Sequence, residues 1–287
     1  MDRPESAPVN TKVNRMSTRI AILGGGVMGE TLLSALLDAG NAAADLVVSE
    51  KLAARADELR ERHGVEVTGN AEAVAGADVV LVVVKPQDVP TLLAEIAPAV
   101  DPDATVVSLA AGIRIATVES ALPDGIAVVR AMPNTPALVG EGMFGISPGS
   151  SCTGERLLQV RELLATGGEV VVVDESGQDA VTAVSGSGPA YVFYLAEAMV
   201  DGGVEAGLDT ETARILATQT LVGAAKLLAT SDDDAAELRR RVTSPNGTTA
   251  AAIEAFDERG VHDALVAGVL AAARRSAELS GPEDGRV

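Results

Sequence analysis

Short apolar runs alternate with helical patterns through the first half of the chain. The strand candidates are residues 19–23, 46–49, 65–67, 78–85, 105–110, 126–132 and 169–174. Between them, apolar residues recur every three or four positions and predict helices at 29–40, 51–64, 73–77 and 88–100. The run 78–85 has no polar face, which is typical of a strand buried on both sides of a parallel sheet. The alternation predicts an α/β domain built on a doubly wound, mostly parallel sheet.

The pattern changes after about residue 178, where no further β-branched run follows. Alanine- and leucine-rich helices are predicted at 188–206, 210–230, 234–242, 249–259 and 261–280. Asp209 or Thr210 can cap one of them, and Asp234 with Glu237 has capping-box spacing. Several of these helices are apolar on more than one face, so they need partners beyond their own domain. We therefore expect an all-α domain that dimerises through its helices.

These patterns divide the chain into three parts. They are a disordered tail at 1–17, a nucleotide-binding domain at 18–178 and an all-helical substrate-binding and dimerisation domain at 179–287. The tail is polar and lacks the apolar segment of a signal peptide.

Composition narrows the function classes. The 287 residues carry a formal net charge of −19, which disfavours binding to nucleic-acid backbones. Cys152 is the only cysteine, so no internal disulfide can form and a cytoplasmic location is expected. Next to Thr153, a candidate helix cap, Cys152 is interpreted as a bystander. The two histidines, His63 and His262, lack metal-ligand spacing and are interpreted as surface residues. We expect no metal site and, because no long uncharged apolar run occurs, no membrane span.

The clearest chemical motif follows the first strand. In "AILGGGVMGETL", Gly24, Gly26 and Gly29 form a G-x-G-x-x-G pattern between a strand and a helix. The first glycine allows a tight turn, the second lets the backbone approach a pyrophosphate, and the third lets the helix pack closely. The helix N-terminus then offers free N–H groups to the negative charge. The context indicates a Rossmann dinucleotide site.

The identity of the dinucleotide depends on residues after the second strand. Glu50 stands about where an acid binds the ribose 2′-OH of NAD. Ser49, Lys51 and Arg55 surround it, and a hydroxyl with two cations can instead hold the 2′-phosphate of NADP. We expect both cofactors to be used, with NADPH slightly preferred. Lys85, at the end of the run 78–85, is equally compatible with a ligand contact and with a solvated lysine.

Several segments together resemble one family, the pyrroline-5-carboxylate reductases, across about residues 18–278. They are "GGGVMGETL", "VVVKPQ", "SLAAGI", "RAMPNTPALVGEG", "DAVTAVSGSGPAYVF" and "VTSPNGTT". The resemblance implies a Rossmann domain followed by a helical dimerisation domain. It also implies NADPH- or NADH-dependent reduction of 1-pyrroline-5-carboxylate to L-proline, in interlocked homodimers that assemble into decamers.

The resemblance also assigns residues. Cofactor contacts are implied at Gly24, Gly25, Gly26, Val27, Met28, Gly29, Ser49, Lys51, Asn70, Val84, Lys85, Pro86, Ala110, Ala111 and Gly112. Substrate contacts are implied at Glu175, Ser187, Ser244, Gly247, Thr248 and Thr249. One departure stands out, since Asn246 occupies a position where many relatives have glycine. Asparagine tolerates left-handed backbone angles, so the loop shape can survive.

The stretch "TSPNGTT" at 243–249 allows two interpretations. A helix begins near Thr249, and free N–H groups at a helix start can bind the substrate carboxylate. By analogy with the family that the chain resembles, Thr249 is then the candidate catalytic residue, as the partner of the substrate ring nitrogen. Alternatively, Ser244 and one of the threonines only cap the helix. Gly188-Pro189, with Ser185 and Ser187 before it, indicates a second helix start.

Two other function classes compete with the reductase. A β-hydroxyacid dehydrogenase would use a lysine on a helix of the second domain, where Lys226 is the only lysine after residue 178. A non-catalytic nucleotide-sensing dimer would bind the cofactor but would not need a polar loop at 243–249. The chemistry of imine reduction needs neither histidine nor cysteine, because the cofactor supplies the reductant and the protein supplies position and charge.

Overall fold

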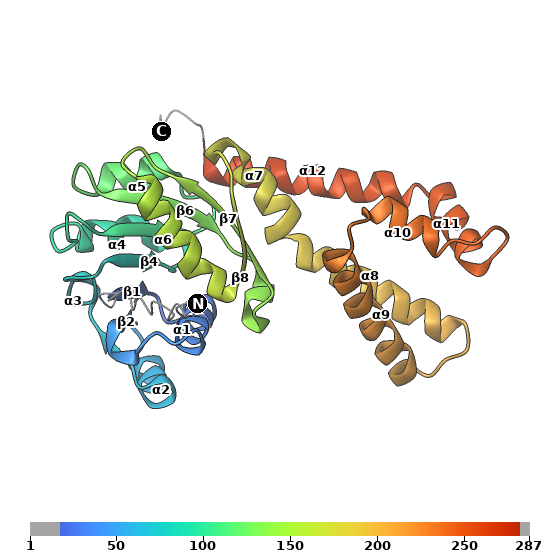
Figure 1. Ribbon diagram of the computed structural model, residues 1–287, viewed down its shortest axis with the longest axis horizontal. Coiled ribbons are helices and arrows are strands. Elements are labelled where there is room, and N and C mark those ends of the chain that lie inside the picture. The colour runs from blue at the N-terminus through green and yellow to red at the C-terminus, as the bar shows by residue number, and fades with distance from the viewer. Residues whose placement is uncertain (1–17, 282–287) are drawn as a thin grey trace, which may run out of the picture. The chain divides into compact units, whose positions relative to one another are not determined.

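The computed structural model describes residues 18–281 (Figure 1). The expected disordered tail at 1–17 lies outside this range. The strands are β1 (Ile20–Leu23), β2 (Leu46–Ser49), β3 (Glu66–Thr68), β4 (Val79–Val82), β5 (Thr105–Ser108), β6 (Ala127–Met132), β7 (Gly142–Pro148) and β8 (Gly168–Val172). The helices of the same part of the chain are α1 (Val27–Asp38), α2 (Ala53–His63), α3 (Asn70–Val74), α4 (Val89–Ile96), α5 (Ile115–Ala121) and α6 (Gly154–Leu164).

The described strands form one sheet in the order β3-β2-β1-β4-β5-β6-β7-β8. All the pairs from β3 through β6 are parallel, as is β7 with β8. The residues of β1, β2, β4 and β5 are all buried, which explains their β-branched and aliphatic composition. The order reverses between β1 and β4, and in open α/β sheets ligands bind beyond the carboxyl ends of the strands at such a point.

The second half of the described chain is helical, as predicted. It contains α7 (Gln178–Val181), α8 (Gly188–Glu205), α9 (Thr210–Thr230), α10 (Ala235–Arg241), α11 (Thr248–Glu258) and α12 (Val261–Ser280). α8 and α9 pack along each other (Figure 1). Asp209 caps α9 by accepting from the Thr212 N–H at 2.9 Å, and Asp234 caps α10 by accepting from the Glu237 N–H at 2.8 Å. Large apolar side chains on α8, α9 and α12 remain exposed, among them Phe193, Ile215, Val222, Leu265 and Leu270.

By contacts, the chain separates into two compact units. Among the described residues, one contains 18–110, 115–130 and 148–166, and the other contains 111–114, 131–147 and 167–281. Segments from the middle of the sequence therefore belong with the helices.

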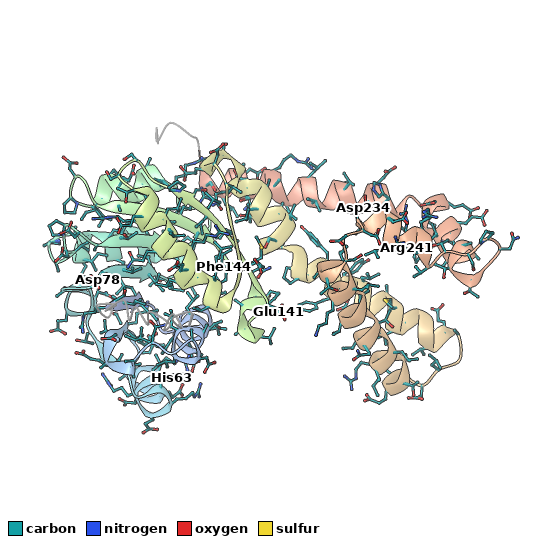
Figure 2. The ribbon with its side chains drawn as sticks, viewed as in Figure 1. His63, Asp78, Glu141, Phe144, Asp234 and Arg241 are labelled. Atoms are coloured by element: carbon teal, nitrogen blue, oxygen red, sulfur yellow. The ribbon has the colours of Figure 1, made fainter. Side chains whose placement is uncertain are left out.

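Four of the described strands and helices, β7, α5, α6 and α7, have no counterpart among the predicted ranges. β7 carries two glycines and ends on proline, a composition typical of turns. A Cβ atom at Gly145 would lie 2.5 Å from Val181 Cγ1, so the glycine admits a side chain of α7 against the strand. Phe144 beside it is fully buried (Figure 2). Packing, rather than local preference, determines this strand. α5 and α7 are too short to show an extended apolar period, and of α6 only the capping residue Thr153 was predicted.

Candidate functional site

The glycine-rich turn joins β1 to α1 as the motif predicts. Gly24 has φ +111°, a left-handed angle that disfavours side chains. Its N–H donates to the Ser49 carbonyl at 2.9 Å, and a Cβ there would lie 2.9 Å from the Val83 carbonyl oxygen. The turn is therefore held between the ends of β2 and β4, at the reversal of strand order.

Gly26 and Gly29 have opposite surroundings. Gly26 caps α1 without any side-chain hydrogen bond, and nothing lies within 4 Å of the place where its Cβ would be. At Gly29, a Cβ would collide with the Gly24 carbonyl oxygen. The start of α1 is thus open to solvent or a ligand at Gly26 and tightly packed against the protein backbone at Gly29. Both features fit a pyrophosphate resting on free N–H groups at this helix start.

Ser49, the last residue of β2, and Asn70, the first residue of α3, are both implied as cofactor contacts and lie together. The Ser49 hydroxyl donates to Asn70 Oδ1 at 2.5 Å, and the Asn70 amide donates to Glu95 Oε2 at 2.8 Å. The chain of hydrogen bonds fixes the orientation of both side chains. The two residues therefore present one preorganised polar surface beside the glycine-rich turn.

Glu50 points back into the protein backbone. Its Oε2 accepts from the Gly25 N–H at 3.1 Å, and its Oε1 accepts from the Leu52 N–H at 2.8 Å. Each carboxylate oxygen therefore already accepts a hydrogen bond from a backbone amide of the protein. Glu50, at the position that binds a ribose hydroxyl in NAD-specific folds, thus holds the backbone of the glycine-rich turn here.

The two cations beside Glu50 differ in availability. Arg55 is only 22% exposed, and its guanidinium binds Glu30, Glu58 and the Gly25 carbonyl. Lys51 is 81% exposed, with its Nζ 3.9 Å from Asp88 Oδ2. Of these two, Lys51 is the one free to meet a 2′-phosphate.

The other implied cofactor segments follow β4 and β5. Lys85 and Pro86 are exposed after β4, with Val84 half-buried before them. Ala110 is buried and Ala111 exposed, and Gly112 has a φ of +75°.

Arg114, just after Gly112, is a contributor that sequence reasoning missed. Its guanidinium donates to the carbonyls of Ser280 at 3.3 Å and Gly281 at 2.8 Å, at the end of α12. A cation at a helix C-terminus is favourable, but no local pattern shows that α12 ends there. Arg114 thus ties the implied cofactor segment to the last described helix.

The loop at 244–247 is a tight turn. The Gly247 N–H donates to the Ser244 carbonyl at 3.0 Å across Pro245 and Asn246. Asn246 has φ 61° and is the one non-glycine residue with positive φ within 18–281. Proline followed by a left-handed residue is the pattern of a type II turn. Asn246 thus adopts the left-handed backbone angle that asparagine was expected to tolerate.

The start of α11 is not capped by a side chain. Gly247 is the N-cap residue, and no side-chain oxygen caps the helix. The interpretation of Ser244 and a threonine as caps is therefore wrong. The Ser244 hydroxyl lies against Gly247, since a Cβ atom at Gly247 would collide with it. Thr248 and Thr249 are the first two helical residues, so their N–H groups have no partner within the helix.

We expect the Asn246→Gly variant to keep the stability and activity of the wild type. We expect Asn246→Ala to lower both. Glycine adopts φ 61° freely, whereas alanine there costs about 1–2 kcal/mol. Thermal unfolding and kcat/KM for the substrate measure the two effects. Equal behaviour of the alanine and glycine variants would show that the left-handed turn is not required.

The segments "MPNTP" and "SGSGPAY" are joined by Asn134. Its amide donates to the Ser185 hydroxyl at 3.2 Å, and its Oδ1 accepts from the Met143 N–H at 2.8 Å. Residues 182–186 form a single π-helical turn, a distortion frequent at functional sites. Ser187 follows as the N-cap of α8, again without a side-chain cap, and Glu175 is half-buried in a turn before α7.

The interpretation of His63 as a surface residue is wrong. Its side chain is 12% exposed, and its Nε2 lies 2.9 Å from Glu30 Oε1, at the end of α2 (Figure 2). The partner is 33 residues away on α1, beyond the reach of local sequence patterns. His262 is exposed, as predicted.

Cys152 does not have the surroundings of a reactive thiol. Burial raises the pKa of the Cys152 thiol more than nearby Arg156 lowers it, which disfavours the nucleophilic thiolate. Within residues 18–281, His, Cys, Asp and Glu side chains form no group of three or more that could hold a metal ion. No helix in the same range has the length and apolar character to cross a membrane.

Comparison with known proteins shows the family of the chain. Residues 175–279 match the family model for pyrroline-5-carboxylate reductase dimerisation, and residues 19–112 match the model for NADP oxidoreductase, coenzyme F420-dependent. The pyrroline-5-carboxylate reductase of Mycobacterium tuberculosis is 46% identical over 284 residues, covering 91% of this chain and 96% of the relative.

Solved structures extend the comparison. A pyrroline-5-carboxylate reductase from Coxiella burnetii superposes with a TM-score of 0.88 at 31% identity, covering 93% of this chain and 100% of its own. The Plasmodium falciparum enzyme with NADP bound has a TM-score of 0.81 at 26% identity, covering 92% of this chain and 98% of its own. The chain belongs to the pyrroline-5-carboxylate reductase family.

Proposed function

We propose how this reductase converts 1-pyrroline-5-carboxylate to L-proline with NAD(P)H. The start of α1 holds the cofactor, and the start of α11 holds the substrate. When bound, the reduced nicotinamide supplies the hydride for the imine carbon. The observation that carries the proposal is the uncapped start of α11, where Gly247 leaves the first N–H groups without partners in the helix or from side chains.

The uncapped helix start suits a carboxylate. Its N–H groups and helix dipole attract negative charge without any lysine or arginine. In a chain with net charge −19, such a backbone site provides a local positive potential that can attract the substrate carboxylate. Ser244, Gly247 and Thr248 are proposed to hold the substrate carboxylate there.

Thr249 is proposed to act on the ring nitrogen. It is half-buried in the first turn of α11, and its hydroxyl is not used as a cap. A threonine hydroxyl can accept a hydrogen bond from the protonated imine and donate one to the amine of the product. Glu175 and Ser187 are proposed as further substrate contacts.

The fit of the turn to a dinucleotide rests on the open side of Gly26 and the packed side of Gly29. Gly24 to Gly29, with Val27 and Met28, are proposed to hold the pyrophosphate. Ser49, Lys51, Asn70, Val84, Lys85, Pro86 and Ala110 to Gly112 are proposed to hold the remainder. Both NADPH and NADH are proposed as cofactors, with NADPH slightly preferred.

We expect Lys51→Gln to raise the KM for NADPH about threefold to tenfold and to leave the KM for NADH unchanged. The exposed ammonium contributes only to the contact with the 2′-phosphate, which NADH lacks. Steady-state kinetics with each cofactor measure the ratio. A wild-type preference for NADH of about tenfold or more in kcat/KM would remove the proposed selectivity.

The exposed apolar faces of α8, α9 and α12 support a homodimer formed through the C-terminal helices. Assembly of such dimers into a decamer, in the cytoplasm, completes the proposal. Sedimentation of the purified protein distinguishes a monomer, a dimer and a decamer.

A substrate comparison tests the function itself. We expect NADPH oxidation with 1-pyrroline-5-carboxylate and no NAD(P)+ reduction with 3-hydroxy acids. Lys226, the one candidate for a dehydrogenase lysine, lies exposed on α9. Cofactor binding without turnover of the imine would instead support the nucleotide-sensing dimer.

A further inference from the structure

The peptide groups on both sides of Gly25 are held by α2 and the loop before it. The Gly25 N–H donates to Glu50 Oε2 at 3.1 Å, and the Gly25 carbonyl accepts from Arg55 Nε at 2.9 Å. A Cβ at Gly25 would lie 2.5 Å from Leu59 Cδ1, so the backbone rests directly on α2. The glycine-rich turn is therefore fixed by side chains outside the motif.

Arg55 is itself immobilised by carboxylates. Its Nη2 binds Glu30 Oε2, and its Nη1 binds Glu58 Oε2 at 2.9 Å. Glu30 also accepts from Arg62 at 2.5 Å and contacts His63 at 2.9 Å. Burial opposes ionisation of Glu30, but hydrogen bonds from His63, Arg55 and Arg62 outweigh it and lower its pKa to about 2. Glu30 thus stays ionised and keeps Arg55 in place near neutral pH.

The planarity of the peptide bond transmits this constraint to Gly26. In a trans peptide, the carbonyl of one residue and the N–H of the next point in opposite directions in one plane. Because Arg55 holds the Gly25 carbonyl, the Gly26 N–H must point away from Arg55. Gly26 is the open N-cap of α1, where an anion can approach. The Gly25 N–H is already bound to Glu50, so it is withheld from a ligand.

We propose that Arg55 is a positioning residue for the cofactor pyrophosphate, acting through the Gly25–Gly26 peptide, and not a ligand of the 2′-phosphate. This inference rests on the proposed cofactor site at the start of α1. Because the pyrophosphate is common to both dinucleotides, loss of Arg55 must weaken the binding of NADPH and NADH equally. Loss of Lys51, in contrast, is expected to weaken the binding of NADPH alone.

The test compares Arg55→Gln with Arg62→Gln in the full-length protein. Both variants remove one cation from Glu30, but only Arg55 touches the Gly25 carbonyl. Isothermal titration with NADP+ and with NAD+ gives each Kd directly, independent of turnover. We expect Arg55→Gln to weaken both by the same factor, about tenfold, and Arg62→Gln to leave both within about twofold.

Kinetics add a second readout. At saturating cofactor, kcat and the KM for the imine should be close to wild type in Arg55→Gln, because only cofactor positioning is lost. If Arg55→Gln does not fold, Arg55→Lys retains a charge for Glu30 but cannot reach the Gly25 carbonyl and both carboxylates together, and the same equal loss is expected.

Two outcomes would overturn the inference. A loss confined to NADP+ would show that Arg55 contacts the 2′-phosphate, and unchanged Kd values for both dinucleotides would show that the clamp does not position the turn. Failure of the wild-type protein to bind either dinucleotide would instead refute the proposed cofactor site, so the two failures are distinguishable.

Discussion

We expect Thr249→Ala to lower kcat/KM for 1-pyrroline-5-carboxylate about 100-fold while the Kd for NADPH stays unchanged. The substitution removes the hydroxyl proposed to bond the ring nitrogen, and positioned groups of this kind contribute on the order of 100-fold or more. The backbone N–H of residue 249 survives, so grip on the carboxylate should persist. The loss should therefore fall mainly on kcat, as measured by steady-state kinetics.

Three controls separate this role from a structural one. Thr249→Ser keeps the hydroxyl and should retain most of the activity. Thr248→Ala, one residue earlier at the same helix start, should lose less than Thr249→Ala. No side-chain cap is removed by either alanine, so the melting temperature should change little. Full activity of Thr249→Ala would show that the Thr249 hydroxyl does not act on the ring nitrogen.

The second large effect is expected at the glycine-rich turn. Gly26→Ala should raise the Kd for both NADPH and NADH at least about tenfold, because a methyl group there occupies the open side of the α1 start. Gly26 has φ −68°, which alanine accepts, so stability should change by less than about 1 kcal/mol. Isothermal titration and thermal unfolding measure these two quantities.

Gly29→Ala provides the contrast within the same motif. Its new methyl group would collide with the backbone oxygen of Gly24, which cannot move aside, and stability should fall by about 3 kcal/mol. One glycine is thus needed for ligand approach and the other for packing. If Gly26→Ala bound cofactor normally, the pyrophosphate would not lie at the start of α1.

Most elements follow from local periodicity. The β-branched runs became strands within a few residues of their predicted bounds, and the long helices after residue 187 are confirmed. β7 was missed because Gly145 leaves space for Val181, a requirement set by a helix more than 30 residues away. His63 was misplaced for the same reason, since Glu30 lies on a different helix.

The candidate site divides in a similar way. Sequence motifs predicted that the glycines, Ser49, Lys51 and the loop at 244–249 belong to the site. Local signals could not show that Arg55 binds the Gly25 carbonyl or that Arg114 binds the end of α12. Both arginines donate to backbone carbonyls, which every residue carries, so no sequence pattern marks the partner.

The sequence by itself determined most of the strands and helices, the glycine-rich turn and the polar loop, because these depend on side-chain periodicity and on backbone angles that only certain residues adopt. Tertiary structure alone decided which charges remain free. Arg55 and Lys51 are equivalent cations in the sequence, yet one is held by Glu30, Glu58 and Gly25 while the other stays exposed. The difference arises because α1 and α2 bring carboxylates to Arg55, and a buried charge must be paired where an exposed one need not be.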